Sequence, residues 1–245
     1  MKSYLLAFTL LMCLTVTSRA QSVAAIINKN ITARGGLRQI ENIQSIKMSG
    51  YASMNGINAP FTIIMERPEK LRIELMMRND TIIQAYDGHN GWAKIPQGNK
   101  SIITSMTPAE AQSLKEQADF DGPLVHYKEK HNEVTLQGKV SIDSVASYNL
   151  VVKNPQGEQT SMFVDSRTYH IIREVTRKKV SGANPVSSHM ARIKTNYGDF
   201  RKVQGLVLPF SIETFVDGNK ISRLEIDSIH LNGTFSDSLF AKPTR

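Results

Sequence analysis

The side chains of this 245-residue chain that could do chemistry are its histidines and one group of carboxylates. The six histidines form no HxH, HxxxH or HExxH pair, the short spacings at which two imidazoles often share a metal ion. His126 and His131 lie five residues apart around Glu129, in a polar stretch that is typical of a surface turn. The sequence therefore predicts no metal site and no cofactor.

Glu116, Asp119 and Asp121 form a cluster in which two carboxylates could act as general acid and general base, as in glycoside hydrolysis. Asp119 and Asp121 flank Phe120 just before a Gly-Pro pair, which is typical of a solvated helix exit. The motifs GxSxG, SxxK, GxGxxG and GxxxxGK are absent from the sequence. We therefore expect a protein that is not an enzyme, with a hydrolase that uses these three acids as a less favoured alternative.

Residues 1–20 have the pattern of a cleaved secretory signal. Lys2 precedes an apolar run over 5–16, and the small-x-small triplet at 18–20 fits a cleavage site. The run is shorter than the roughly 20 apolar residues that a membrane-spanning helix needs. Cys13, the only cysteine, follows Leu11-Met12 instead of the small residues of a lipidation signal. We expect a secreted protein whose mature chain has no thiol, with lipidation of Cys13 as a minor alternative.

Residues 21–245 are expected to form one domain, because no linker or repeat divides them. The formal charge of +8 is spread along the chain, which favours contact with anionic lipid or acidic partners and gives no sign of nucleic acid binding. Apolar residues at 23, 26, 27 and 31 predict a first helix within 22–43, and Gly35-Gly36 is typical of a helix end.

From residue 45 the apolar period changes from 3.6 to 2, which predicts strands. The alternating runs 61–65 and 71–77 are separated by a proline-containing turn and predict a hairpin. A helix is expected over 107–119, where Thr107, Pro108 and Glu110 form a strong start signal. Further strands are expected at 81–86, 92–95, 101–106, 134–140, 147–152, 160–164, 171–176, 190–197, 206–216 and 223–231.

One sheet of ten or more strands tends to curl and so presents a concave face. Several methionines lie in or beside the first strands, and this soft side chain suits either core packing or binding of varied apolar ligands: Met54, Met65, Met76, Met77 and Met106. Each methylene of an acyl chain that such a face removes from water would contribute about 0.8 kcal/mol.

Several short motifs follow one another along the chain: Phe61-x5-Arg67-Pro68-x2-Leu71-Arg72, Asp87-Gly88-x3-Trp92, the segment 117–125, and Gly205-Leu206-x2-Pro209-x2-Ile212-Glu213. Their order resembles the periplasmic outer-membrane lipoprotein-sorting family, the LolA/LolB-like carriers and receptors. The last two motifs are similar to the longer form of the family that is predicted in Bacteroidota.

The resemblance implies a mainly β protein with minor α content, built on a single strongly curved antiparallel sheet. This incomplete β-barrel would carry the N-terminal and inserted helices as a lid. It implies that Arg67 holds the lid through hydrogen bonds to its carbonyl groups, the alternative being a turn residue before a proline. The acyl cavity is expected to include Phe61, Ile63, Met65, Leu71, Ile73, Leu75, Met77 and Trp92.

The function implied by the resemblance is a monomeric periplasmic carrier. It would bind acyl chains of lipoproteins or related lipids without covalent chemistry and deliver them toward the outer membrane. Its partners would be the acylated cargo and membrane-bound donor and acceptor proteins. An envelope scaffold that binds a protein partner on the concave face is the second possibility.

Overall fold

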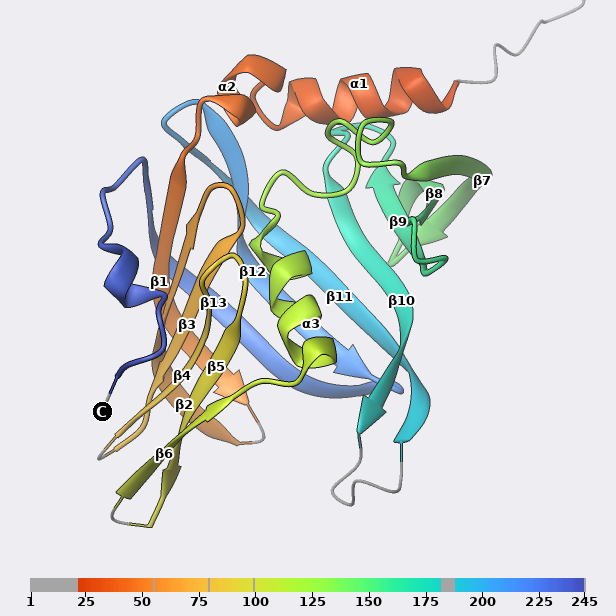
Figure 1. The fold of residues 1–245 in the computed structure, drawn as a ribbon. Coiled ribbons are helices and arrows are strands. Elements are labelled where there is room, and N and C mark those ends of the chain that lie inside the picture. The colour runs from red at the N-terminus through yellow and green to blue at the C-terminus, as the bar shows by residue number, and fades with distance from the viewer. Residues whose placement is uncertain (1–21, 55, 79, 99, 182–187, 245) are drawn as a thin grey trace, which may run out of the picture.

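A computed structural model describes residues 22–54, 56–78, 80–98, 100–181 and 188–244 of the chain (Figure 1). The predicted signal peptide, including Cys13, lies outside these residues. The described part folds into one antiparallel sheet of thirteen strands with three α-helices and a short 3-10 helix. None of the described helices is both long and apolar enough to cross a membrane.

The helices are α1 (Val23–Ala33), α2 (Leu37–Glu41), α3 (Pro108–Ala118) and the 3-10 helix η1 (Asp237–Leu239). The strands are β1 (Ser45–Met54), β2 (Ile57–Glu66), β3 (Lys70–Met76), β4 (Thr81–Tyr86), β5 (Gly91–Gln97), β6 (Lys100–Ser105), β7 (Glu133–Ile142), β8 (Val145–Lys153), β9 (Gln159–Asp165), β10 (Ile171–Ser181), β11 (Ser188–Val203), β12 (Leu206–Val216) and β13 (Asn219–Leu231).

The strand order is β6-β5-β4-β3-β2-β1-β13-β12-β11-β10-β9-β8-β7. Strands that are consecutive in the sequence pair with each other, except β6 with β7. β1 pairs with β13 as well as with β2, and this pairing joins the two halves. The sheet does not close, because β6 and β7 remain its two edges. It curves so strongly that the wall formed by β1–β6 faces β10 and β11 across a hollow (Figure 1). The predicted fold class is confirmed.

The hairpin predicted around residue 67 is formed by β2 and β3. Phe61 lies opposite Leu75 and Met65 opposite Leu71, so the alternating apolar residues of both strands share the concave face. The other face of the same strands carries Arg72, directly opposite Ile64. The period of two in the sequence therefore corresponds to the two faces of the curved sheet.

Helices α1 and α2 lie across one end of the hollow (Figure 1). Ser22 caps α1 by accepting a hydrogen bond from the backbone N–H of Ala25, and Ile26 and Ile27 are buried against β8 and β9. The helix ends at Gly35, whose φ of +123° favours glycine. A Cβ there would lie 2.5 Å from the carbonyl oxygen of Gly205, so the close approach also requires glycine.

Helix α3 lies inside the hollow, against β3, β4 and β5 (Figure 1). The predicted capping box is present: Thr107 and Glu110 each satisfy the other's backbone N–H. Leu114 and Ala118 are buried in the same apolar cluster as the concave residues of the β2–β3 hairpin. The inserted helix therefore fills one half of the concave face.

The C-terminal segment packs on the convex face. The sequence analysis predicted no element after residue 231. Phe240 is fully buried, and its carbonyl oxygen accepts a hydrogen bond of 2.7 Å from Nε1 of Trp92. Register explains this placement, because Trp92 lies opposite Ala85, and Ala85 opposite Arg72, on the convex face. The prediction that Trp92 shares a face with the hairpin residues is corrected: it anchors the C-terminal segment from outside.

Replacement of Phe240 by alanine is expected to lower the free energy of unfolding by about 3–5 kcal/mol, because it leaves a cavity beneath the C-terminal segment. Urea unfolding followed by circular dichroism measures the change. Tyr51→Ala is the control, since Tyr51 is 56% exposed and its loss should change stability by no more than about 0.5 kcal/mol. Equal effects of the two substitutions would contradict the placement of Phe240.

Candidate functional site

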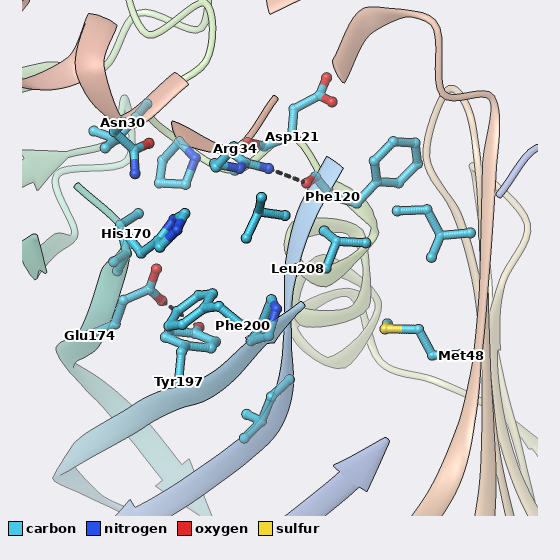
Figure 2. A pocket seen from close by; sticks show the side chains of 18 of the residues that line it. Asn30, Arg34, Met48, Phe120, Asp121, His170, Glu174, Tyr197, Phe200 and Leu208 are labelled. Carbon is cyan, nitrogen blue, oxygen red and sulfur yellow. Dashed lines mark hydrogen bonds between the residues drawn. The ribbon is translucent and has the colours of Figure 1, made fainter. Parts of the chain in front are cut away.

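A cavity of about 240 Å³ lies in the half of the hollow that α3 leaves open (Figure 2). Its walls come from α1, the 119–125 segment that follows α3, and the concave face of β1, β2 and β10–β12. Because α1, β1 and β2 meet β10–β12 there, the cavity exists only once the sheet has curled.

One side of this cavity is apolar. Ile46 and Met65 lie directly opposite each other in the β1–β2 pair, and Met48 continues the same face. Leu208 and Ile212 of β12 extend the apolar surface, and Phe120 approaches it from the 119–125 segment. In Figure 2, Leu208 lies near the centre of the view, with Phe120 and Met48 to its right. This surface can hold hydrocarbon but offers no group for covalent chemistry.

The opposite side of the cavity is polar, with Asn30, His170, Glu174 and Tyr197 on the left of Figure 2. The Tyr197 hydroxyl donates a hydrogen bond of 3.0 Å to Oε2 of Glu174. Burial raises the pKa of Glu174, although the Tyr197 hydroxyl and the charge of Arg34 partly oppose this shift. Burial also raises the pKa of Tyr197 and lowers the pKa of His170, so the imidazole is neutral at pH 7.

Arg34, at the end of α1, ties that helix to the 119–125 segment. Its Nη1 donates a 2.6 Å hydrogen bond to the carbonyl oxygen of Asp121, and Nη2 donates one of 3.2 Å to that of Phe120. Burial lowers the pKa of the guanidinium, and nearby carboxylates, Asp121 first, counteract the shift. Arg34 therefore remains a cation at the wall of the cavity.

Arg67 binds the same segment from the β2–β3 turn. Its guanidinium forms a bidentate pair with the Asp121 carboxylate, at 2.6 and 2.8 Å, and this hydrogen bonding raises the pKa of Arg67. Nε donates to the carbonyl oxygen of Ile43 at 2.6 Å and Nη2 to that of Ile40 at 3.2 Å. The guanidinium also lies 4.6 Å from the centre of the Phe120 ring. Hydrogen bonds to carbonyl groups were expected for Arg67; that they hold a lid stays a prediction.

The structure brings only Met65, among the predicted cavity residues, to the wall of this cavity. Met77 lies just beyond β3, with its backbone N–H bonded to the carbonyl oxygen of Asp80. The remaining hairpin residues belong to the apolar cluster that contains α3: Phe61, Ile63, Leu71, Ile73 and Leu75. These residues pack in the core in this structure, which is the alternative that the sequence analysis left open beside ligand binding.

The three acids of the hydrolase alternative each pair with a different cation. Asp121 pairs with Arg67, Asp119 with Lys130, and Glu116 with Lys178 of β10. These ion pairs account for the cluster as structural contacts of α3 and of the 119–125 segment. Within the described ranges, no group of three or more histidine, aspartate or glutamate side chains is placed to hold a metal ion.

The sequence analysis did not identify the polar side of the cavity. Glu174 lies in a strand with the ordinary mixture of apolar and charged residues, and Arg34 reads as a surface residue beside a helix end. Neither has a motif or spacing that marks it. The curl of the sheet, which brings α1 to β10 and β11, makes them neighbours.

The sequence matches no protein-family model and no curated protein. Solved structures do match over 89% of the chain. A LolA superfamily protein from Nitrosomonas europaea matches with a TM-score of 0.56 over 97% of its own chain, at 14% identity. The chain has the LolA fold. A DUF1329 family protein from Desulfovibrio piger matches with a TM-score of 0.58 over 97% of its chain, at 12% identity.

A putative outer membrane lipoprotein-sorting protein domain from Vibrio parahaemolyticus matches with a TM-score of 0.55 over 95% of its chain, at 7% identity. At such low identities these likenesses establish the LolA fold and not the activity. The resemblance seen in the sequence motifs is confirmed at the level of the fold. The longer Bacteroidota-type form stays a prediction.

Replacement of Arg67 by leucine is expected to lower the free energy of unfolding by about 2–4 kcal/mol. This is below the 3–5 kcal/mol typical of a broken buried ion pair, because the Arg67 side chain is 27% exposed. The substitution leaves the Asp121 carboxylate buried without its cation. Hydrogen exchange of the 119–125 amides should accelerate more than exchange in β8 or β9.

Arg223→Leu is the control for Arg67→Leu. It breaks a solvent-screened pair with Glu225 and should change stability little. Equal effects of the two substitutions would contradict the role of Arg67 in fastening the segment.

Glu174→Gln is expected to change how stability depends on pH. The folded-state pKa of Glu174 is raised above 4.5, so the folded protein binds this proton more tightly than the unfolded chain. The resulting stabilisation is complete below pH 4.5 and is lost as the pH rises through the folded-state pKa. The wild-type free energy of unfolding should therefore fall relative to that of Glu174→Gln above pH 4.5. Urea unfolding at a series of pH values measures the difference, and a constant difference would show that Glu174 is solvated.

Proposed function

We propose that this protein is a periplasmic carrier that holds the acyl chains of a lipoprotein or a related lipid in the cavity of its curled sheet. It would deliver them toward the outer membrane without covalent chemistry, between membrane-bound donor and acceptor proteins. The observation that carries the proposal is a cavity with an apolar side, between a LolA-type sheet and its helices. Burial of hydrocarbon there would supply the binding free energy, at about 0.8 kcal/mol per methylene.

The size of the cavity bears on how such a carrier would work. About 240 Å³ is below the roughly 300–1,000 Å³ of ordinary ligand sites, so the present arrangement has room for part of an acyl chain. Helix α3 covers the concave face over β3–β5, and α1 packs against β8 and β9. A longer chain would therefore require α3 and the 119–125 segment to move away from the sheet.

The ion pairs of α3 present little obstacle to its displacement, and the burial of Leu114 and Ala118 is the apolar contact that would be lost. The helix is fastened at its sides by two ion pairs, Lys115 with Glu69 and Glu116 with Lys178, whose side chains all keep about a third or more of their surface exposed. Exposed pairs contribute little to stability. The polar bonds to break then include those that Arg67 and Arg34 make with the 119–125 segment. To hold the lid is the role that the resemblance assigns to Arg67.

Extraction of the purified protein with organic solvent, followed by mass spectrometry, tests the proposal. Co-purified acylated molecules in near-stoichiometric amount are the expected result. Lipid-free protein that fails to take up lipid from vesicles, and that instead retains a tight protein partner, would favour the scaffold alternative. A hydrolytic activity abolished by Asp119→Asn or Glu116→Gln would favour the enzyme.

Leu208→Trp is expected to reduce bound lipid roughly tenfold, because the indole would occupy the apolar side of the cavity while the wall stays apolar. The measurement is the molar ratio of extracted lipid to protein. Leu37→Trp makes the same change at a site that is 39% exposed on α2, and should leave the ratio unchanged. Equal lipid content in the two folded variants would place the ligand elsewhere.

A further inference from the structure

Two buried polar atoms at the polar side of the cavity have no hydrogen-bond partner within the described structure. They are Oδ1 of Asn30 and Nδ1 of His170, and both residues line the cavity. An unsatisfied buried polar atom costs about 1–3 kcal/mol, so such a pair at a cavity wall suggests a ligand group that bonds them.

The orientation of the Asn30 amide is set by its other atom. Nδ2 donates a 2.7 Å hydrogen bond to the carbonyl oxygen of Tyr169, so the free atom at position 30 is the oxygen, an obligate acceptor. The ring of His170 is held in place by stacking on Phe200, with centroids 4.6 Å apart. Asn30 therefore requires a hydrogen-bond donor on the ligand, and the neutral imidazole can accept or donate.

The chemistry of these atoms bears on the charge of the ligand group. Glu174 lies on the same side, and its Oε2 accepts from Tyr197. Arg34 is a counter-charge, and two of its five N–H groups donate to the carbonyl groups of Phe120 and Asp121. A carboxylate would have no hydrogen to offer Asn30, so these atoms favour an uncharged ligand group that carries a donor.

We propose that the polar side of the cavity binds the uncharged head of an acylated ligand through a hydroxyl or amide N–H that donates to Asn30, while the acyl chain lies along Met48 and Leu208. This inference rests on the proposed function and narrows its cargo. The carrier would select glycerides or N-acyl amides over free fatty acids and other anionic lipids. The two sides of the cavity, facing each other in Figure 2, match the two ends of such a molecule.

The test compares three ligands with the same acyl chain by isothermal titration calorimetry, on delipidated protein and below the concentration at which each lipid aggregates. Monolaurin has hydroxyl donors and no charge, methyl laurate has neither, and laurate has a charge and no donor. Monolaurin should bind roughly tenfold more tightly than methyl laurate, which corresponds to one satisfied buried hydrogen bond. Laurate should bind most weakly.

Matched variants locate the effect. Asn30→Leu should remove the preference for monolaurin over methyl laurate. Asn149→Leu is the control: its Oδ1 is also buried and unpartnered, but Asn149 lies on β8 and does not line the cavity. If Asn30→Leu fails to fold, His170→Phe keeps the stacking on Phe200 while it removes Nδ1, and should reduce the preference.

Three outcomes overturn the inference. Equal affinities for monolaurin and methyl laurate would show that the head is not recognised, and the carrier function would stand without this selectivity. Tighter binding of laurate than of monolaurin would show that Arg34, and not Asn30, receives the head. Failure of all three lipids to bind would remove the proposed carrier function together with the inference.

Discussion

The arrangement of the cavity depends on the guanidinium of Arg67. From the turn between β2 and β3 it reaches the last turn of α2, the Ile43 carbonyl group before β1, and the carboxylate of Asp121. A planar group with five fixed donors can make these bonds together, which the single ammonium of a lysine could not. Arg34 holds the same segment from α1. Arg34 thus joins α1 to the 119–125 segment, and Arg67 joins α2 to the same segment.

A sheet of thirteen strands that does not close leaves its concave face to be covered. The chain does this unevenly. Helix α3 packs against β3–β5 and buries apolar side chains there as an ordinary core, while α1 buries a second cluster against β8 and β9. Between these two clusters the concave face is covered less tightly, and the cavity lies at that place. The same curvature that creates two cores therefore creates the space between them.

The chemistry of the cavity differs between its two sides because different strands supply them. β1, β2 and β12 contribute aliphatic and methionine side chains, whereas β10 and β11 contribute Glu174 and Tyr197. In a low-dielectric surrounding, a buried polar group either has a partner or costs free energy. Glu174 and Tyr197 satisfy each other, while Asn30 and His170 each keep one atom unbonded. The polar side is therefore a set of groups that a ligand could complete, beside a surface that suits hydrocarbon.

The sequence by itself determined the elements and the class of fold, because these follow from local rules. A period of two marks strands, the Thr107–Glu110 capping box starts α3, and Gly35 ends α1, and each signal is confirmed at its position. The motif around Arg67 also indicated contacts with carbonyl groups. The tertiary structure alone decided which face each strand turns inward, and the pairing of β1 with β13. That pairing needs Gly50, since a Cβ there would lie 2.0 Å from the Glu225 carbonyl oxygen. The tertiary structure likewise decided that Trp92 points outward and that Asn30, His170 and Glu174 meet. The curvature of a sheet sums small twists over many strands, so it leaves no local mark in the chain.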